Sequence, residues 1–399
     1  DEGFLGQLKH REEGDDEFMH GRSFRKQVLE FHEFAGYEPF QNAAHVLADR
    51  QFLAADAVMG AVLGPRQDRQ PGGGEFLRMH ARQAFRGGGQ DFTIALQPGT
   101  EQQNYSISLR DPYVFDSDYE AGINANYRIR EYDEFSENRF ATGLSLGRRF
   151  GERWFGAASL RYNNIDIYDI EDEANAATDL LDVKGAHDLT GLGFRLERTT
   201  VDSRLRPTRG AKVSLGVERI GVLGGDYDFT KLGANHLVYF PIDEDFFGRK
   251  TVVSLKTEVS YIPEGQDSAP LFERYYRGGN SFRGFRFRTI SPKGYQPPPP
   301  KGDGSLTSDP VGGIFMFFFG PEIEKPIVDD LLAINFFLDT GTVDEEFTFE
   351  NYRVSGGFGF RLYIEALSPA PLAFDFGFPI LRQEGDRERV FSFKIDIPF

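Results

Sequence analysis

The stretch KTVVSLKTEVSY (Lys250–Tyr261) alternates between apolar and polar residues. Successive side chains of an extended chain point to opposite faces, so this period of two predicts a two-sided β-strand. The apolar face carries Val253, Leu255, Val259 and Tyr261, and the polar face carries Ser254, Lys256, Glu258 and Ser260. The same period recurs in DFTIALQ (91–97), NYSISLR (104–110), FDFGF (374–378) and FSFKIDIPF (391–399). The chain is therefore predicted to be built largely from two-sided strands.

The composition of the two faces favours a sheet in a membrane over a soluble sandwich. A soluble sandwich also alternates, but its apolar face is usually rich in Val, Ile and Leu. Here Phe and Tyr dominate that face, with Phe 40 and Tyr 16 in 399 residues, while Lys, Glu, Asp and Arg recur on the other. This pattern fits a lipid-facing wall around a polar lumen, and a barrel closes every sheet edge as lipid requires.

The overall composition excludes several other classes. The net charge of −17 argues against general nucleic-acid binding, which needs a positive field. The chain has no cysteine, so neither a disulfide framework nor a thiolate metal site is expected. The densest apolar run, IFMFFF (314–319), is far shorter than the 18 or so residues of a membrane helix. We expect no metal site and no cofactor.

Counting alternating segments predicts an all-β fold, a transmembrane antiparallel β-barrel of about 16 strands in residues 51–399. The expected strands are 52–63, 75–85, 90–98, 102–114, 119–130, 138–149, 152–165, 188–199, 209–220, 227–241, 250–262, 312–326, 331–340, 352–364, 371–379 and 389–399. Residues 1–50 form a separate pre-barrel segment, in which SFRKQVLEFHEFAG (23–36) predicts a short helix. Two connections are long: an acidic one (168–188), expected as an exposed loop, and one over 263–311.

The second long connection contains RYYRGGNSFRGFRFRTISP (274–292), which is rich in arginine, glycine and aromatic residues and has no acid. Taken alone, such a segment could bind RNA. In an acidic chain it could equally be a folded loop whose arginines are held by carboxylates elsewhere. Composition leaves both readings open.

Within this loop, SFRGF (281–285) resembles the V-R-G-F/Y signature of the BamA/two-partner-secretion transporter superfamily of outer-membrane insertases and translocators. Further motifs resemble the same family in the same order: SISLRDPYVFD (106–116), RTTVDSRLRPTRGAKVSLGVE (198–218), GPEIEKPI (320–327), FFLDTGTV (336–343) and GGFGFRLYIEALSPAPLAFDFGFPI (356–380). The chain departs from the family at Phe282, usually Val or Ile, and at Ala370, usually Gly. Residues 1–50 are too short for one complete POTRA module, the periplasmic domain that normally precedes the barrel.

The resemblance implies that the extracellular loop over 263–311 folds back into the lumen, with Arg283, Gly284 and Phe285 at its tip. Strand alternation places Glu322 and Asp339 on the inward face of the two strands that follow. An arginine donates several hydrogen bonds in a fixed fork that carboxylates accept. We therefore expect Arg283 to pair with both acids, at the matching family positions, while Gly284 allows a tight turn.

A barrel closes where its first and last strands pair, and a weak seam there could open and template an incoming strand. The seam residues are expected to be Phe52, Ala54 and Val58 on one side, and Phe391, Phe393, Ile395, Ile397 and Phe399 on the other. The resulting hypothesis is that the protein inserts other β-barrels into the bacterial outer membrane. The resemblance implies outer-membrane lipids and lipopolysaccharide, nascent barrel clients, and periplasmic or lipoprotein accessory subunits as partners, and no nucleic acid.

Two other classes compete with this hypothesis. In a secretion pore of the two-partner type, a polypeptide threads the lumen and residues 23–36 form a plug helix. An enzyme is not expected, because the 7 His are scattered without H-x-x-x-H spacing and no catalytic residue is identified. Inward carboxylates resemble the acid pairs of glycosidases, but a polar lumen supplies such pairs by default.

Overall fold

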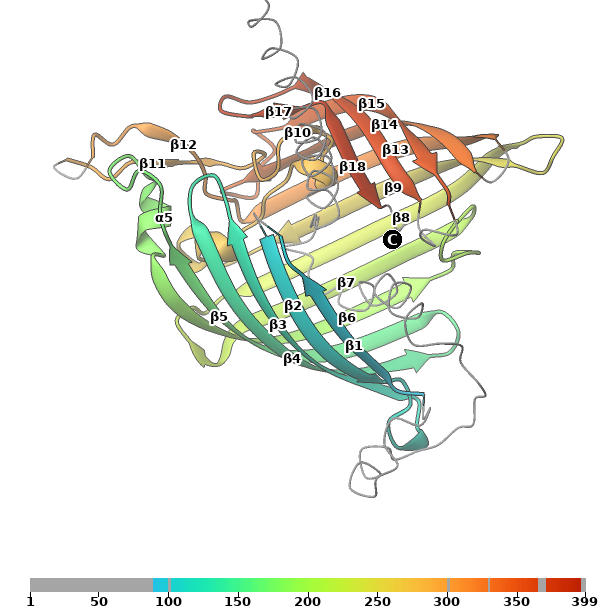
Figure 1. Ribbon diagram of the computed structural model, residues 1–399, viewed down its shortest axis with the longest axis horizontal. Helices are drawn as coiled ribbons and strands as arrows, with labels where there is room; N and C mark the ends of the chain where they lie inside the picture. Colours follow the sequence, from blue (N-terminus) through green and yellow to red (C-terminus); the bar gives the residue numbers. More distant parts are fainter. Residues whose placement is uncertain (1–88, 100–101, 300–301, 329–330, 365–370, 396–399) are drawn as a thin grey trace, which may run out of the picture.

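Fourteen strands form one antiparallel sheet in the computed structural model, which describes residues 89–99, 102–299, 302–328, 331–364 and 371–395 (Figure 1). The strands are β1 (Asp91–Gln97), β2 (Gln102–Asp111), β3 (Tyr119–Glu131), β4 (Ser136–Phe150), β5 (Trp154–Tyr168), β6 (Gly185–Thr199), β7 (Gly210–Gly225), β8 (Thr230–Glu244), β9 (Lys250–Tyr261), β13 (Phe315–Val328), β14 (Leu332–Asp344), β15 (Arg353–Leu362), β16 (Leu372–Leu381) and β18 (Phe391–Ile395). Each strand pairs with the next in this order, and β1 and β18 end the described sheet.

The predicted fold class is confirmed. All fourteen strands expected from residue 90 onward overlap an observed strand of this sheet. The two expected earlier strands, 52–63 and 75–85, lie outside the described residues, as does the pre-barrel segment 1–50. One expectation needs correction: the last strand, expected to run unbroken over 389–399, is interrupted at Val390.

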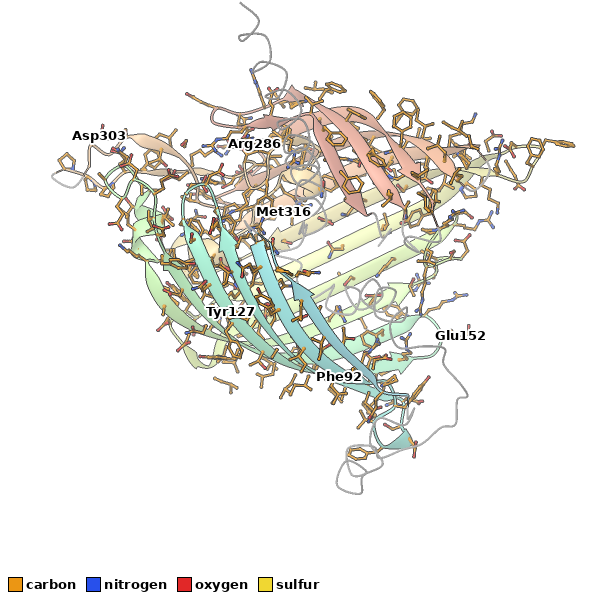
Figure 2. All side chains as sticks on the ribbon, in the orientation of Figure 1. Phe92, Tyr127, Glu152, Arg286, Asp303 and Met316 are labelled. Atoms are coloured by element: carbon orange, nitrogen blue, oxygen red, sulfur yellow. The ribbon has the colours of Figure 1, made fainter. Side chains whose placement is uncertain are left out.

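The two faces of the sheet differ as the alternation predicts. On β14, Phe336 is 54% exposed on the outer face, whereas Asn335 and Asp339 are 0% and 1% exposed on the inner face. Outward positions of the early strands carry exposed aromatic side chains, such as Phe92 on β1 and Tyr127 on β3 (Figure 2). The outer face is thus apolar and the inner face polar, as a membrane barrel wall requires.

The connections differ in length at the two ends of the sheet. At one end, called the turn end, β4 and β5 are joined by residues 151–153, and β8 and β9 by residues 245–249. At the other, the loop end, β5 and β6 are joined by residues 169–184, and β9 and β13 by residues 262–314. Short turns face the periplasm in outer-membrane barrels, and long loops face outward. No helix among the described residues has the length and hydropathy to cross a membrane.

Residues 262–314, called the inward loop, form much of the apolar core. Their short elements are η2 (Gln266–Ser268), η3 (Leu271–Glu273), η4 (Gly279–Ser281), β10 (Gly284–Phe285), β11 (Lys293–Tyr295) and β12 (Leu306–Pro310). The core cluster joins Phe282, Phe285 and Ile290 of this loop to Ile165 and Leu189 of the wall. Large apolar side chains therefore hold the loop against the wall independently of the ion pairs.

The acidic connection between β5 and β6 is not the exposed loop that the sequence suggested. It contains the helix α5 (Thr178–Asp182), whose Leu180 is only 1% exposed. Ala177 is fully buried in the same core cluster, and its backbone NH donates to Asp309 at 2.9 Å. The expectation was wrong here because it weighed the acids and not the apolar residues between them. The remaining short elements are η1 (Val114–Asp116) and β17 (Glu388–Arg389).

Candidate functional site

Arg283 is buried between two carboxylates. Its Nε and Nη2 donate to the two oxygens of Asp339 at 2.9 and 2.7 Å, and its Nη1 donates to Glu322 Oε2 at 2.6 Å. Its backbone NH also donates to Asp339, at 2.9 Å, and its guanidinium lies 3.4 Å from the ring centroid of Phe337. Burial alone would lower the pKa of Arg283, but the Asp339 and Glu322 carboxylates raise it well above its ordinary value.

Strand register explains why these side chains meet. Glu322 on β13 lies opposite Phe337 on β14, so Glu322, Phe337 and Asp339 share the inner face. Two inner residues that the sequence analysis did not single out join them: Arg361 on β15 and Asp375 on β16. Arg361 donates to Asp375 at 2.8 Å and to Glu322 at 3.2 Å, and is 1% exposed. The same alternation could have found both, because each lies on the polar face of a quoted strand.

Five charged residues form this site, called the Arg283 cluster: Arg283, Glu322, Asp339, Arg361 and Asp375. The cluster contains two cations and three carboxylates. Desolvation makes an ion pair of this kind a weak source of net stability, but removing one partner leaves a buried charge uncompensated. The cluster is therefore better suited to fixing the position of the loop tip than to increasing overall stability.

The loop tip touches the wall through its backbone. Gly284 has φ +94°, a left-handed conformation that favours glycine, and a Cβ there would lie 2.4 Å from Ser355 Oγ. A Cβ on Gly377 of β16 would lie 2.5 Å from the Gly284 nitrogen. The backbones of the loop tip and β16 can come this close only because both residues are glycines. Phe282, which departs from the family pattern, packs edge-to-face on Phe318 with ring centroids 5.6 Å apart.

The tip also forms β-structure with the segment before the last strand. β10 pairs antiparallel with β17, Gly284 opposite Arg389 and Phe285 opposite Glu388. The next residue continues the pairing, since the Arg286 NH donates to the Arg387 carbonyl at 2.8 Å. Beyond Phe376, opposite Phe391, the pairing of β16 with the last strand ends in one bond, from Gly377 NH to the Val390 carbonyl at 2.8 Å. The last strand thus leaves β16 at Val390 and is held by the loop tip instead.

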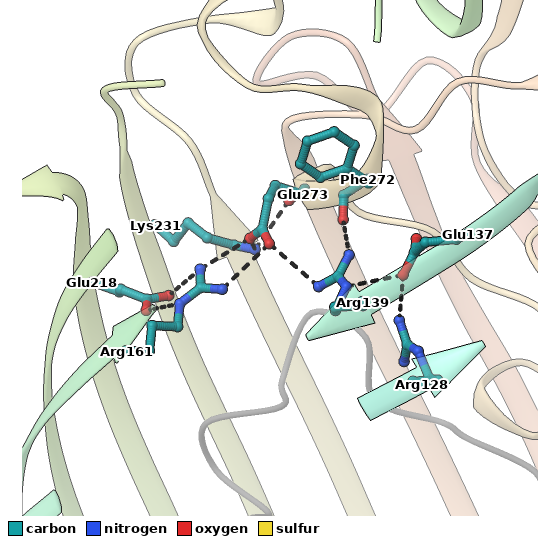
Figure 3. Close-up of polar contacts among 8 residues, drawn as sticks. All are labelled: Arg128, Glu137, Arg139, Arg161, Glu218, Lys231, Phe272 and Glu273. Atoms are coloured by element: carbon teal, nitrogen blue, oxygen red, sulfur yellow. Dashed lines mark hydrogen bonds and ion pairs between the residues drawn. The ribbon is translucent and has the colours of Figure 1, made fainter. Parts of the chain in front are cut away.

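A second set of ion pairs attaches the loop to the opposite part of the wall (Figure 3). Glu273 in η3 lies 3.1 Å from Arg161, 3.0 Å from Lys231 and 3.5 Å from Arg139. The contacts continue along the inner face to Glu218, Glu137 and Arg128. Burial alone would raise the pKa of Glu273, but Arg161, Lys231 and Arg139 hold it well below its ordinary value. No local sequence pattern predicts this group of ion pairs, the Glu273 cluster, because nothing near Glu273 marks it as the acid that inward cations would select.

The other arginines of the loop have internal roles, with one exception. Arg274 pairs with Asp179 of α5, and Arg277 pairs with Glu258 of β9. Arg288 stacks on Tyr276 and Tyr132, with its guanidinium carbon 3.9 and 4.5 Å from the ring centroids. Arg286 alone among them is exposed. The segment 274–292, whose composition suggested RNA binding, instead places its arginines inside the protein, with the exception of Arg286.

The expected seam residues are only partly described. Phe391 and Phe393 pack in tilted geometry on Phe376 and Phe374 of β16, with ring centroids 5.4 and 5.0 Å apart, and Ile395 lies opposite Leu372. The expected partners Phe52, Ala54 and Val58, with Ile397 and Phe399, lie outside the described residues. Pairing of the first and last strands therefore stays a prediction. Over the residues that are described, no cluster of three or more His, Asp or Glu has a geometry that could hold a metal ion.

Comparison with known proteins places this site in a family context. Residues 84–399 match the Omp85 superfamily domain. The chain is 30% identical over 246 residues to the outer membrane protein assembly factor BamA of Nitratidesulfovibrio vulgaris, covering 60% of this chain and 29% of that protein. It is 23% identical over 320 residues to the assembly factor BamA of Neorickettsia risticii, covering 77% of this chain and 40% of that protein. The chain thus spans less than half the length of these two relatives.

Solved structures show the same fold. The crystal structure of BamA from Haemophilus ducreyi lacking POTRA domains 1–3 matches with a TM-score of 0.64 at 19% identity, over 76% of this chain and 64% of that chain. CdiB from Acinetobacter baumannii matches with a TM-score of 0.51 at 15% identity, over 76% and 52%. Since the family domain covers most of the sequence, the chain belongs to the Omp85 superfamily, and the protein is an integral β-barrel protein of the outer membrane.

Proposed function

We propose that this protein inserts β-barrel proteins into the outer membrane through a seam between its first and last strands. The observation that carries the proposal is the break in the last strand at Val390. β18 pairs with β16 only as far back as Phe391, and the chain before Val390 pairs with the loop tip instead. An end strand that leaves its neighbour in this way is a weak edge, and a weak edge can accept a strand from another chain.

The chemistry needed is hydrogen bonding and burial, and no catalytic residue takes part. A client strand that pairs with the edge of β18, exposed when the seam opens, satisfies its own NH and carbonyl groups, which would otherwise lie unpaired in lipid. Burial of the client's apolar face in the bilayer drives the reaction forward. The partners implied are unfolded barrel clients, and the accessory subunits with which an assembly factor works. The names of the two curated relatives as assembly factors support this reading.

Cysteine cross-linking tests the seam, because the chain contains no cysteine of its own. Phe393→Cys is combined in turn with Phe52→Cys, Ala54→Cys and Val58→Cys, and the protein is reconstituted with an unfolded client barrel. We expect the pair that forms a disulfide to stop client assembly, and a reductant to restore it. The matched control is Phe374→Cys with Phe393→Cys, which joins β16 to β18 away from the seam and should leave assembly intact. Full assembly in the seam-linked protein would refute a lateral opening.

A secretion pore is the second candidate. The fold that this chain shares with CdiB is compatible with a secretion pore. At 15% identity, however, this similarity is evidence for the fold and not for the function. The same seam-linked protein separates the two functions, since a polypeptide that threads the lumen does not need the seam to open. Export of a partner polypeptide by the cross-linked form, together with no client assembly by the reduced form, would favour the pore.

A further inference from the structure

The outer face of the sheet carries a groove near the turn end. It has a volume of about 550 Å³ and is lined by residues of β4, β5, β6 and β7, together with Tyr119 at the start of β3. Its floor is β5, where the outward positions Gly156 and Ala158 carry little or no side chain. Its walls are Leu146 and Phe150 on β4, and Phe194 with neighbouring apolar residues on β6.

Strand register produces this shape. Ala158 lies opposite Leu146 on one side and Phe194 on the other, so two large side chains flank a small one. Neighbouring strands lie about 4.8 Å apart, so the walls stand roughly two strand spacings from each other. That width, reduced by the side chains themselves, accommodates one hydrocarbon chain. Leu146 and Phe194 are 52% and 55% exposed, so the walls project into lipid.

Two arginines lie beside the turn end of the groove. The Arg148 guanidinium lies between the rings of Tyr119 and Phe150, 5.0 and 5.7 Å from their centroids, and donates to the Tyr119 hydroxyl at 3.3 Å. Across β5, the Arg198 guanidinium lies 5.7 Å from the Trp154 ring centroid. Within the described part of the chain, neither guanidinium forms an ion pair with a carboxylate, and Arg148 Nε is buried without a hydrogen-bond partner.

This arrangement is unusual for the molecule. The chain has a net charge of −17, and inward arginines such as Arg283 and Arg161 are paired with acids. On an outer face, an arginine without a carboxylate partner needs an anion from its surroundings. Aromatic side chains and arginines at the level of the headgroups are suited to bind both the acyl and the phosphate part of a lipid.

We propose that this groove binds one phospholipid with an anionic headgroup, in the leaflet that faces the turn end. One acyl chain lies over Gly156 and Ala158, between the walls. The phosphate accepts hydrogen bonds from Arg148 and Arg198. The site requires only membrane insertion and is independent of the seam mechanism.

The single tryptophan of the chain provides the test, because Trp154 lies opposite Phe150, at the turn end of the groove. The protein is reconstituted in phosphatidylcholine vesicles that contain brominated phosphatidylglycerol or brominated phosphatidylcholine, whose bromines quench tryptophan on contact. We expect the brominated phosphatidylglycerol to quench Trp154 at a mole fraction about fivefold lower, the selectivity typical of one arginine beside an anionic lipid surface. Equal quenching by the two lipids would overturn the proposal.

Two pairs of variants locate the effect. Arg148→Gln should remove most of the selectivity, whereas Arg149→Gln, the neighbouring arginine on the opposite face of β4, should keep it. Ala158→Leu should fill the groove and reduce quenching by both lipids, whereas Ala125→Leu, on the outer face of β3 and outside the groove, should not. If Arg149→Gln lowered the selectivity as much as Arg148→Gln, the effect would be general surface charge and the site would be rejected. Retained heat-dependent gel mobility shows that each variant is folded.

Discussion

Arg283 illustrates why arginine, and not lysine, serves at the loop tip. Its planar fork donates to both oxygens of Asp339 while a third nitrogen donates to Glu322. A lysine carries its donors on one nitrogen and cannot present the same planar fork to both carboxylates. The cluster thus fixes the orientation of the tip as well as its position.

Truncating Arg283 is predicted to destabilise the protein by about 3 kcal/mol, because Asp339 would remain buried with less compensation. Arg283→Lys should recover only part of the loss, since the bidentate contact is not restored. Denaturant unfolding in detergent, followed by tryptophan fluorescence, measures both. Arg286→Ala is the control, because its exposed side chain lies in the same loop. Equal costs at 283 and 286 would show that the ion pairs contribute nothing specific.

Glu273 predicts a pH dependence of stability. Its pKa in the folded protein is held well below the ordinary value of 4.5, so the unfolded chain binds the proton more readily. The stabilisation is fully present above about pH 4.5 and is lost as pH falls through the folded pKa. The free energy of unfolding of the native protein should therefore fall more steeply on acidification below that value than that of Glu273→Gln. Parallel pH profiles for the two proteins would exclude this role.

At this scale the sequence predicted one cluster and not the other. The pairing of Arg283 with Glu322 and Asp339 could be predicted from two signals. The motif resemblance implies that Arg283 lies at the loop tip, and the strand period places both acids on the inner face. Glu273 has no such signal: its partners come from three strands, and only the folded chain brings Arg139, Arg161 and Lys231 around it.

The elements around Val390 form a junction. The last strand is divided there, with β18 on β16 and β17 on the loop strand β10. The junction depends on the contact between Gly284 and Gly377, since any side chain at either position would separate the two backbones. Alternation alone could not reveal this break, because FSFKIDIPF (391–399), which begins directly after it, keeps its period of two throughout.

Gly377→Ala is predicted to loosen the junction. Its new Cβ would lie 2.5 Å from the Gly284 nitrogen, and overpacking of this kind costs about 1–3 kcal/mol. The Arg286 amide, which donates to Arg387, should then exchange its hydrogen about tenfold faster or more. Gly233→Ala is the control, because a Cβ there would lie 4.0 Å from its nearest neighbour. Unchanged exchange at Arg286 would mean that the tip is not held by this contact.

Over the whole molecule, two separate ion-pair clusters attach the inward loop to different parts of the wall. The Arg283 cluster uses β13 to β16, and the Glu273 cluster uses β3, β4, β5, β7 and β8. The described contacts of the two clusters share no residue. Between them, the buried Tyr275, Phe282 and Ile290 pack in the common core. The loop is thus a brace across the lumen rather than a tethered plug.

This arrangement predicts additivity. If the apolar core holds the loop in place, Arg283→Ala combined with Glu273→Gln should cost the sum of the single changes, within about 0.5 kcal/mol. The same unfolding measurement completes the double-mutant cycle. If the double variant lost far less free energy of unfolding than the sum, one change alone would already release the loop. The second change would then remove no further contact.

The sequence alone determined the class of fold, the fourteen described strands and the face on which each side chain lies. It could do so because strand alternation is local and a lipid environment imposes it on every strand. The tertiary structure decided which inward charges meet, where the last strand leaves its neighbour, and where small residues on one strand lie between large ones on its neighbours and leave a groove. Those outcomes depend on the register between paired strands and on where the inward loop packs, which no local pattern specifies.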